Sequence, residues 1–167
     1  MNTPIETERK FLIRMPDMEY IKTNEGLRIK KIEQTYLIDD KNTARVRKIT
    51  ENEKISYVKT VKTRISTLSQ YENEFEISKS DYENELKAAD PERKTVNKTR
   101  YAFPFEGHII EIDVFPFWSD RALLEIELSS ENEHFEIPAE IEVIKEVSED
   151  KRYTNKSIAK SIPYDII

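Results

Sequence analysis

Apolar and polar residues alternate with a period of two along much of this 167-residue chain, which is the pattern of β-strands. Short polar turns at residues 51–53 and 106–107 separate two pairs of such segments and predict two hairpins. Strands are expected over residues 4–14, 27–39, 43–50, 54–61, 70–78, 94–103, 108–115 and 121–129. Strands joined by short turns favour an antiparallel barrel over alternating strand and helix units.

Short helices are expected outside these strands. Asp17 can cap one helix, and Ser80 with Glu83 forms a capping box for a second. Residues 131–150 fit a short strand followed by a helix, and Thr154 can cap a C-terminal helix.

Charged residues two positions apart recur in most of the predicted strands. Positions i and i+2 share one face of a strand, and the alternate positions here are often apolar. An ordinary sheet turns such a charged face to water, whereas a sheet closed into a barrel can line a polar interior with it. The recurrence over seven strands favours the barrel. The acidic members are Glu6, Glu8, Glu74, Glu76, Glu111, Asp113, Glu125 and Glu127, and the basic ones are Lys10, Arg45, Arg47, Lys59, Lys98 and Arg100.

We therefore predict a mainly β (α+β) protein, an eight-stranded antiparallel β-barrel that forms a tunnel, with peripheral helices and a C-terminal helix. The length suits one domain over residues 1–167. Hydrophobic residues make up 37% and charged residues 36%, and eight Tyr and seven Phe supply core material, which excludes global disorder.

Composition also excludes several classes of function. Two Gly and no phosphate-loop motif argue against a nucleotide-binding loop, and the absence of Cys excludes thiolate metal sites and Cys nucleophiles. The net charge of −6 disfavours nucleic acid as a partner. Without a long apolar run or a signal peptide, we expect a cytoplasmic protein with no membrane partner.

The mixture of both charge signs indicates the ligand. Carboxylates suit Mg²⁺, which commonly keeps substrate phosphates and waters as its other ligands, and Arg and Lys suit the phosphates. The pattern predicts metal and polyphosphate bound together. His108 and His134 lack a metal-ligand spacing and are expected in structure or surface, and Trp118 is expected in a packed corner.

Glu6-Thr-Glu8-Arg-Lys10 resembles the E-x-E-x-K signature of the CYTH superfamily, the triphosphate tunnel metalloenzymes, and looks closest to the small bacterial inorganic triphosphatases. The resemblance covers nearly the whole chain, through residues 34–37, 45–47, 58–60, 74–76, 98–100, 111–113, 124–128 and 151–157. It implies an eight-stranded tunnel and metal-dependent work on triphosphates.

The resemblance also implies roles for individual residues. Metal ligands would be Glu6, Glu8, Asp113, Glu125 and Glu127, and Glu74, Glu76 and Glu111 would support them or position water. Phosphates would be held by Lys10, Arg45, Arg47, Lys59, Lys98 and Arg100, with Lys156 reaching the substrate from the C-terminal helix. Of these, Glu6, Glu8, Lys10, Lys59, Glu74, Glu76 and Glu111 are the catalytic candidates.

The leading hypothesis is a metal-dependent triphosphatase that uses Mg²⁺ or Mn²⁺ to hydrolyse inorganic tripolyphosphate to diphosphate and phosphate. Three alternatives stay open: a class IV-type adenylate cyclase acting on ATP, a thiamine triphosphatase in which Trp118 stacks on the substrate, and a polyphosphate-binding module without catalysis. A charged β-domain without a ligand is the simplest rival. The oligomeric state is open, a homodimer included.

Overall fold

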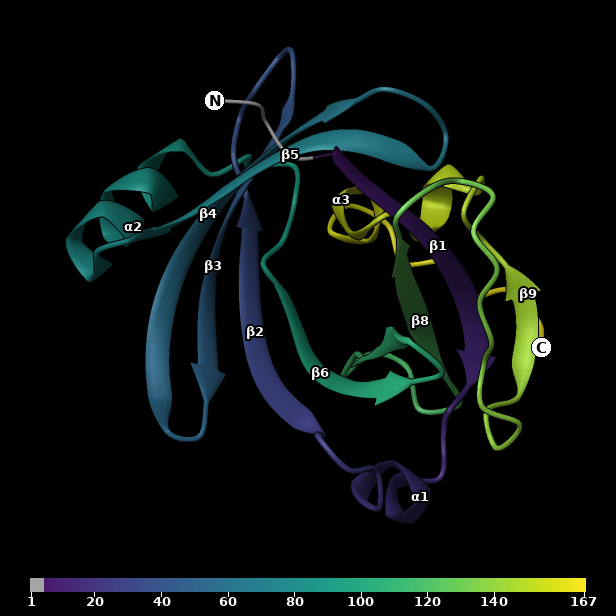
Figure 1. The fold of residues 1–167 in the computed structure, drawn as a ribbon. Helices are drawn as coiled ribbons and strands as arrows, with labels where there is room; N and C mark the ends of the chain where they lie inside the picture. The colour runs from purple at the N-terminus through teal and green to yellow at the C-terminus, as the bar shows by residue number, and fades with distance from the viewer. Residues whose placement is uncertain (1–4) are drawn as a thin grey trace.

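The protein is an antiparallel β-barrel in a computed structural model that describes residues 5–167 (Figure 1). Pro4, where the first strand was predicted to begin, lies outside the described residues. The strands run in the order β5-β4-β3-β2-β6-β7-β8-β1-β9, and pairing of β1 with β5 closes the first eight into a barrel. Their bounds are β1 Ile5–Arg14, β2 Arg28–Tyr36, β3 Thr43–Glu51, β4 Lys54–Arg64, β5 Ser69–Ile77, β6 Val96–Phe105, β7 His108–Val114, β8 Arg121–Leu128 and β9 Val143–Glu146. The predicted eight-stranded barrel is confirmed, with β9 as an extra strand on β1.

Both predicted hairpins are present, and each turns through two residues with positive φ. Asn52 and Glu53 have φ values of 50° and 65°, between the paired residues Glu51 and Lys54. Glu106 and Gly107 have φ values of 47° and 80° between β6 and β7. Turns of this kind match the right-handed twist of the flanking strands, which fixes the register of the charged doublets.

The helices are short and lie outside the barrel. Asp17 caps α1 (Met18–Lys22) as predicted, by accepting a hydrogen bond of 2.9 Å from the Glu19 amide. The cap of α2 (Lys79–Glu85) is Ser78 rather than the predicted Ser80, because the extended backbone of Ser78 places its Oγ atom 3.0 Å from the Asp81 amide. A 3-10 turn, η1 (Leu86–Ala88), follows α2.

The C-terminal region is less helical than predicted. Residues 131–150 contain the short strand β9, but only a 3-10 turn, η2 (Lys151–Tyr153), follows it. Thr154 caps the last helix as predicted, with its Oγ1 atom 3.1 Å from the Ser157 amide, although α3 covers only Asn155–Ile158.

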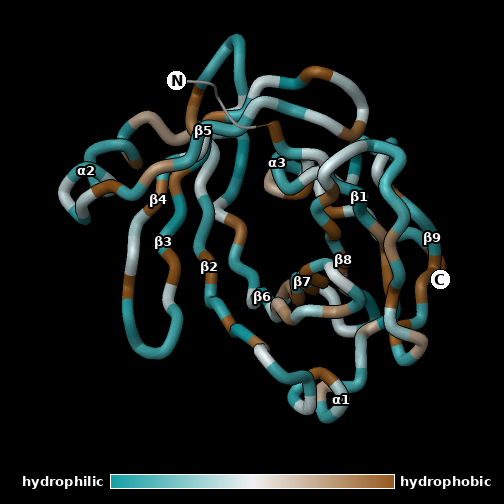
Figure 2. Tube along the Cα trace, in the orientation of Figure 1, coloured by the Kyte–Doolittle hydropathy of each residue, from teal (hydrophilic) through white to brown (hydrophobic). Residues whose placement is uncertain are grey.

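Most of the apolar packing lies outside the barrel wall, so the interior is left to polar side chains. Hydrophobic and hydrophilic positions alternate along the strands (Figure 2). The outward residues of β1, β6, β7 and β8 form one buried cluster with Ile21 of α1 and with Ile141. Tyr82 of α2 packs with Val46 on the outside of β3. A third cluster, which includes Leu12, Trp118 and Tyr153, closes one end of the barrel.

No helix within residues 5–167 has the length and apolar character needed to cross a membrane.

Candidate active site

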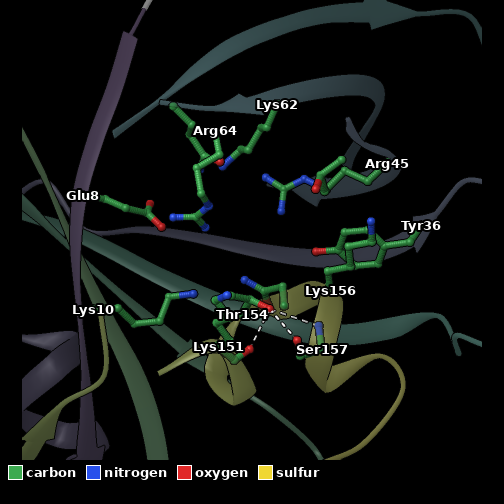
Figure 3. Close-up of a pocket in the computed structure, with 13 residues that line it drawn as sticks. Glu8, Lys10, Tyr36, Arg45, Lys62, Arg64, Lys151, Thr154, Lys156 and Ser157 are labelled. Carbon is green, nitrogen blue, oxygen red and sulfur yellow. Dashed lines mark hydrogen bonds between the residues drawn. The ribbon is translucent and has the colours of Figure 1, made fainter. Parts of the chain in front are cut away.

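A cavity of about 270 Å³ lies at the end of the barrel where β2 and β4 finish and β3 and β5 begin. Strand residues form its wall, and residues 151–157 of the C-terminal segment form its floor (Figure 3). Six cationic side chains and a single carboxylate, that of Glu8, line it. The cations are Lys10, Arg45, Lys62, Arg64, Lys151 and Lys156. Such an excess of positive charge suits a compact polyanion.

Arg45 lines the cavity without a carboxylate partner among the described residues. Among residues 5–167 no carboxylate lies within 4 Å of its guanidinium, and its Nε atom is buried without a hydrogen-bond partner. Arg47, two residues along β3, donates to Glu74 at 2.6 Å, but its Nε atom is also buried and unpaired. Buried donors are rarely left unsatisfied in folded proteins, so these two nitrogens indicate a place for acceptor oxygens.

Lys10 and Lys62 connect the cavity to acidic side chains on the barrel wall. Lys10 Nζ lies 3.3 Å from Glu125 Oε1 and donates to the Tyr153 carbonyl at 3.3 Å. Burial disfavours its charge, but Glu125 and Glu8 outweigh burial and raise the pKa of Lys10. Lys62 Nζ lies 2.7 Å from Glu6 Oε2. Both ammonium groups line the cavity, where an anion can reach them.

Lys98, Arg100, Asp113 and Glu111 come together beside this cavity as an ion-pair network. Lys98 Nζ donates to Asp113 Oδ2 at 2.8 Å, and Arg100 donates to both oxygens of Asp113 at 2.7 and 2.9 Å. The third nitrogen of the Arg100 guanidinium donates to Glu111 at 2.8 Å. Although burial opposes it, attraction to Arg100 and Lys98 holds the pKa of Asp113 far below its usual range. The positive and negative charges of these groups neutralise one another. Both oxygens of Asp113, a predicted metal ligand, already accept hydrogen bonds from Lys98 and Arg100.

The pair Glu8 and Glu127 differs from that network because two carboxylates stand directly opposite each other on β1 and β8. Burial, and then repulsion from Glu125, raises the pKa of Glu8 to about 7. Burial and repulsion from Glu6 raise the pKa of Glu127 as well. Neither carboxylate lies within 4 Å of a cationic side chain in the described part of the chain. Like charges facing each other are costly unless a cation lies between them.

The chemistry of this donor set fits a divalent metal ion, because carboxylate oxygens are the ligands that Mg²⁺ prefers. Over residues 5–167 no three His, Asp or Glu side chains converge into a complete metal site. Glu8 and Glu127, with Glu6 two residues along β1, would hold such an ion, and substrate oxygens and water would complete its shell.

Glu74 and Glu76 lie on the inward face of β5, nearer the rim. Glu74 accepts hydrogen bonds from Arg47 at 2.6 Å and from Thr60 at 2.9 Å. Glu76 is exposed and stands opposite Val58 of β4.

Lys59 does not face the barrel interior, and the prediction that it does is wrong. It pairs with Val46 and Phe75, whose side chains share its face of the sheet, and its Nζ atom lies 2.8 Å from Glu85 of α2. The inward residues of β4 include Val58, Thr60 and Lys62. Lys59 therefore belongs to the outer surface that α2 covers.

Trp118 and the two histidines are not among the residues that line the cavity. Trp118 is only 4% exposed, contacts Phe115 edge-on, and donates its indole N–H to the Pro163 carbonyl at 3.1 Å. It is the packed corner that the sequence predicts, with no free face for a substrate ring. His108 and His134 pair with Glu133 and Glu136.

The sequence interpretation missed Lys62, Arg64 and Lys151 as cavity residues. The signal for the first two was present, because Lys62 and Arg64 continue the period-two pattern of Thr60 beyond Val61, where the strand was predicted to end. Lys156, predicted from the C-terminal helix, does line the cavity. Nothing in the local pattern around Lys151 distinguishes it from a surface lysine.

Comparison with known proteins places the chain among named relatives. An inorganic triphosphatase of Nitrosomonas europaea is 34% identical over 161 residues, which cover 95% of this chain and 99% of that protein. An inorganic triphosphatase of Acetivibrio thermocellus is 36% identical over 132 residues, 78% of this chain and 80% of that protein. No protein-family profile matches the chain.

Solved structures agree with these relatives. A crystal structure of the inorganic triphosphatase NE1496 is 34% identical, covers 98% of this chain and 99% of its own, and superposes with a TM-score of 0.58. The PH1819 protein of Pyrococcus horikoshii superposes with a TM-score of 0.59 at 23% identity, over 76% of this chain and 80% of its own, a likeness of fold alone. Because a relative at 34% identity matches over nearly its full length, this chain belongs to the inorganic triphosphatase family.

Proposed function

We propose that the protein hydrolyses inorganic tripolyphosphate to diphosphate and phosphate, with Mg²⁺ or Mn²⁺ as cofactor. The observation that carries the proposal is the cavity in which six cations face one carboxylate, with the buried Nε atom of Arg45 unpaired. The names of the relatives support the same reaction.

The cations would hold the phosphate chain in a fixed pose. Arg45 and Arg64 approach it from β3 and β4, and Lys151 and Lys156 approach it from the floor (Figure 3). Phosphoryl transfer needs positioning and charge stabilisation more than covalent help from the protein. Donors that are already oriented before the substrate arrives stabilise the charge that develops on the transferring group.

Glu8, Glu127 and Glu6 would hold the metal ion at the acidic wall, next to the cationic cavity. A bound Mg²⁺ or Mn²⁺ neutralises phosphate oxygens and lowers the pKa of coordinated water. In the reaction, the oxygen of one water molecule bonds to a terminal phosphorus, and the bond from that phosphorus to the bridging oxygen breaks. The released protons pass to the products and to solvent.

The test is an assay of the purified protein with tripolyphosphate, ATP and thiamine triphosphate, each with Mg²⁺, Mn²⁺ or EDTA, and with all products separated by ion chromatography. We expect one diphosphate and one phosphate for each tripolyphosphate consumed, only when metal is present. Formation of cyclic AMP from ATP would instead support the cyclase alternative. Tight binding of tripolyphosphate without turnover under any metal would leave a binding module and contradict the proposal.

A further inference from the structure

Two carboxylates hold the floor of the cavity through Arg152: Asp150, which accepts from the Arg152 guanidinium at 3.0 and 2.7 Å, and Asp165, which binds the floor from the C-terminal segment. The Asp165 Oδ1 atom accepts from Arg152 NH1 at 2.8 Å, and its Oδ2 atom accepts from Arg152 NH2 at 3.0 Å. Oδ2 also accepts from the Tyr153 hydroxyl at 2.8 Å and from Lys145 Nζ at 2.9 Å. Asp165 thus holds the two residues that lie between the cavity residues Lys151 and Thr154.

The segment that carries Asp165 is itself fixed to the barrel. The Trp118 indole donates to the Pro163 carbonyl at 3.1 Å, and Arg121 at the start of β8 donates to the Asp165 carbonyl. Lys145, which donates to the Asp165 side chain, belongs to β9. The carboxylate is therefore a fixed point on the barrel rather than part of a free tail.

Tyr153 links Asp165 to the cavity through two hydrogen bonds. Its side chain is fully buried in the apolar cluster that closes the barrel end. Its hydroxyl donates to Asp165, and its carbonyl accepts from the cavity residue Lys10 at 3.3 Å. One residue thus connects the Asp165 carboxylate to a lysine on the opposite wall.

We propose that Asp165 is a positioning residue of the tripolyphosphate site. It acts through Arg152 and Tyr153 and sets where Lys151, Lys156 and Lys10 meet the phosphate chain. The inference rests on the proposed function. A phosphate contact requires an ammonium group within hydrogen-bond distance, so a displaced floor weakens binding even when every lysine is still present.

The experiment compares Asp165→Ala, Asp165→Asn and Tyr153→Phe with wild type in steady-state kinetics on tripolyphosphate. For Asp165→Ala we expect KM to rise about tenfold, the size of one charge-assisted contact, while kcat falls less than about threefold. Tyr153→Phe removes one hydrogen bond and keeps the ring, so a smaller rise in KM is expected. Glu142→Ala, which removes an exposed ion pair with Arg14 and none of the contacts of the Asp165 side chain, is the matched control and should leave KM unchanged.

A double-mutant cycle separates positioning from general loss of stability. If Asp165 acts through the floor, Asp165→Ala should raise KM by a smaller factor in the Lys151→Ala background than in wild type, because one of the three lysines that it positions is already absent. Amide hydrogen exchange of residues 151–158, measured without substrate, should become faster in Asp165→Ala and remain unchanged in Glu142→Ala. Multiplicative effects on KM, or an unchanged KM with the protein folded, would overturn the proposal. Inactive wild-type protein would overturn the proposed function instead, while the exchange result would still report whether Asp165 orders the floor.

Discussion

Replacing Arg45 by Met should weaken tripolyphosphate binding and, at the same time, stabilise the protein without ligand. The two effects have one cause, because the Arg45 guanidinium lines the cavity with no carboxylate within 4 Å among the described residues. The substitution keeps most of the side-chain volume and removes the charge. A residue that serves only the fold would not show opposite effects on binding and stability.

The structure gives the size of each effect. Charge-assisted hydrogen bonds to phosphate contribute about 1.5–3 kcal/mol, so Kd should rise about 10- to 100-fold. Burial, and then repulsion from Arg45, lowers the pKa of Arg47 to about 10, and removing Arg45 relieves that repulsion. Burial also disfavours the charge of Arg45. Its pKa is nevertheless raised on balance, through attraction to Tyr36, a hydrogen bond with Tyr36 and attraction to Glu125. The expected gain in stability therefore comes from relieving the repulsion of Arg47. We expect a gain of about 1 kcal/mol, or about 2–4 °C in Tm.

The assay is calorimetric titration with tripolyphosphate, together with thermal unfolding in EDTA. Lys59→Met is the matched control. It removes a cation from β4, the strand beside β3, but on the outer face of the barrel, where Lys59 pairs with Glu85. The control should bind as wild type does. An Arg45→Met protein with unchanged Kd, or with a Tm below that of the control, would refute the reasoning.

Three further outcomes are expected. Glu8 has a pKa of about 7 against an ordinary 4.5, so the unfolded chain loses this proton first and stability should fall as pH rises from about 4.5 to 7. Glu8→Gln should therefore be more stable than wild type by about 3 kcal/mol in EDTA at pH 8 and equal to it at pH 4, as denaturant titrations would show. Lys62→Met should raise KM and also lower Tm, since it leaves Glu6 without its 2.7 Å partner; a raised KM with unchanged Tm would contradict this. Trp118→Phe should leave the ratio of thiamine triphosphate to tripolyphosphate turnover unchanged, because its ring is buried and its N–H is bonded to Pro163; a selective loss of thiamine triphosphate turnover would contradict this.

The barrel could be predicted because local spacing carries the information. In a strand, a doublet such as Arg45 and Arg47 must share one face, and turns with positive φ at Asn52 and Gly107 fix which residues of neighbouring strands meet. The C-terminal helix was predicted too long, because Thr154 marks a helix start while its end depends on packing against the barrel.

Lys59 shows where this logic fails. Its strand has apolar residues on both faces, with Val58 inward opposite Arg47 and Val61 outward near α2, so the period-two pattern does not decide which face is polar. The contact of Lys59 with Glu85 decides it, and those residues are 26 positions apart. A single charged residue in such a strand is ambiguous, whereas the doublets on other strands are not.

The sequence does not show which charged side chains form ion pairs with each other in the folded protein. That pairing distinguishes charged groups that are already neutralised from those that are free to bind a ligand. Asp113 and Arg100 look as functional in the sequence as Glu8 and Arg45 do, yet Asp113 and Arg100 satisfy each other at 2.7 Å. Glu8 faces another carboxylate, and Arg45 has a buried nitrogen without an acceptor. Unpaired charge inside a barrel costs stability, so two adjacent places of opposite sign support the proposed function, in which a cation and an anion bind there together.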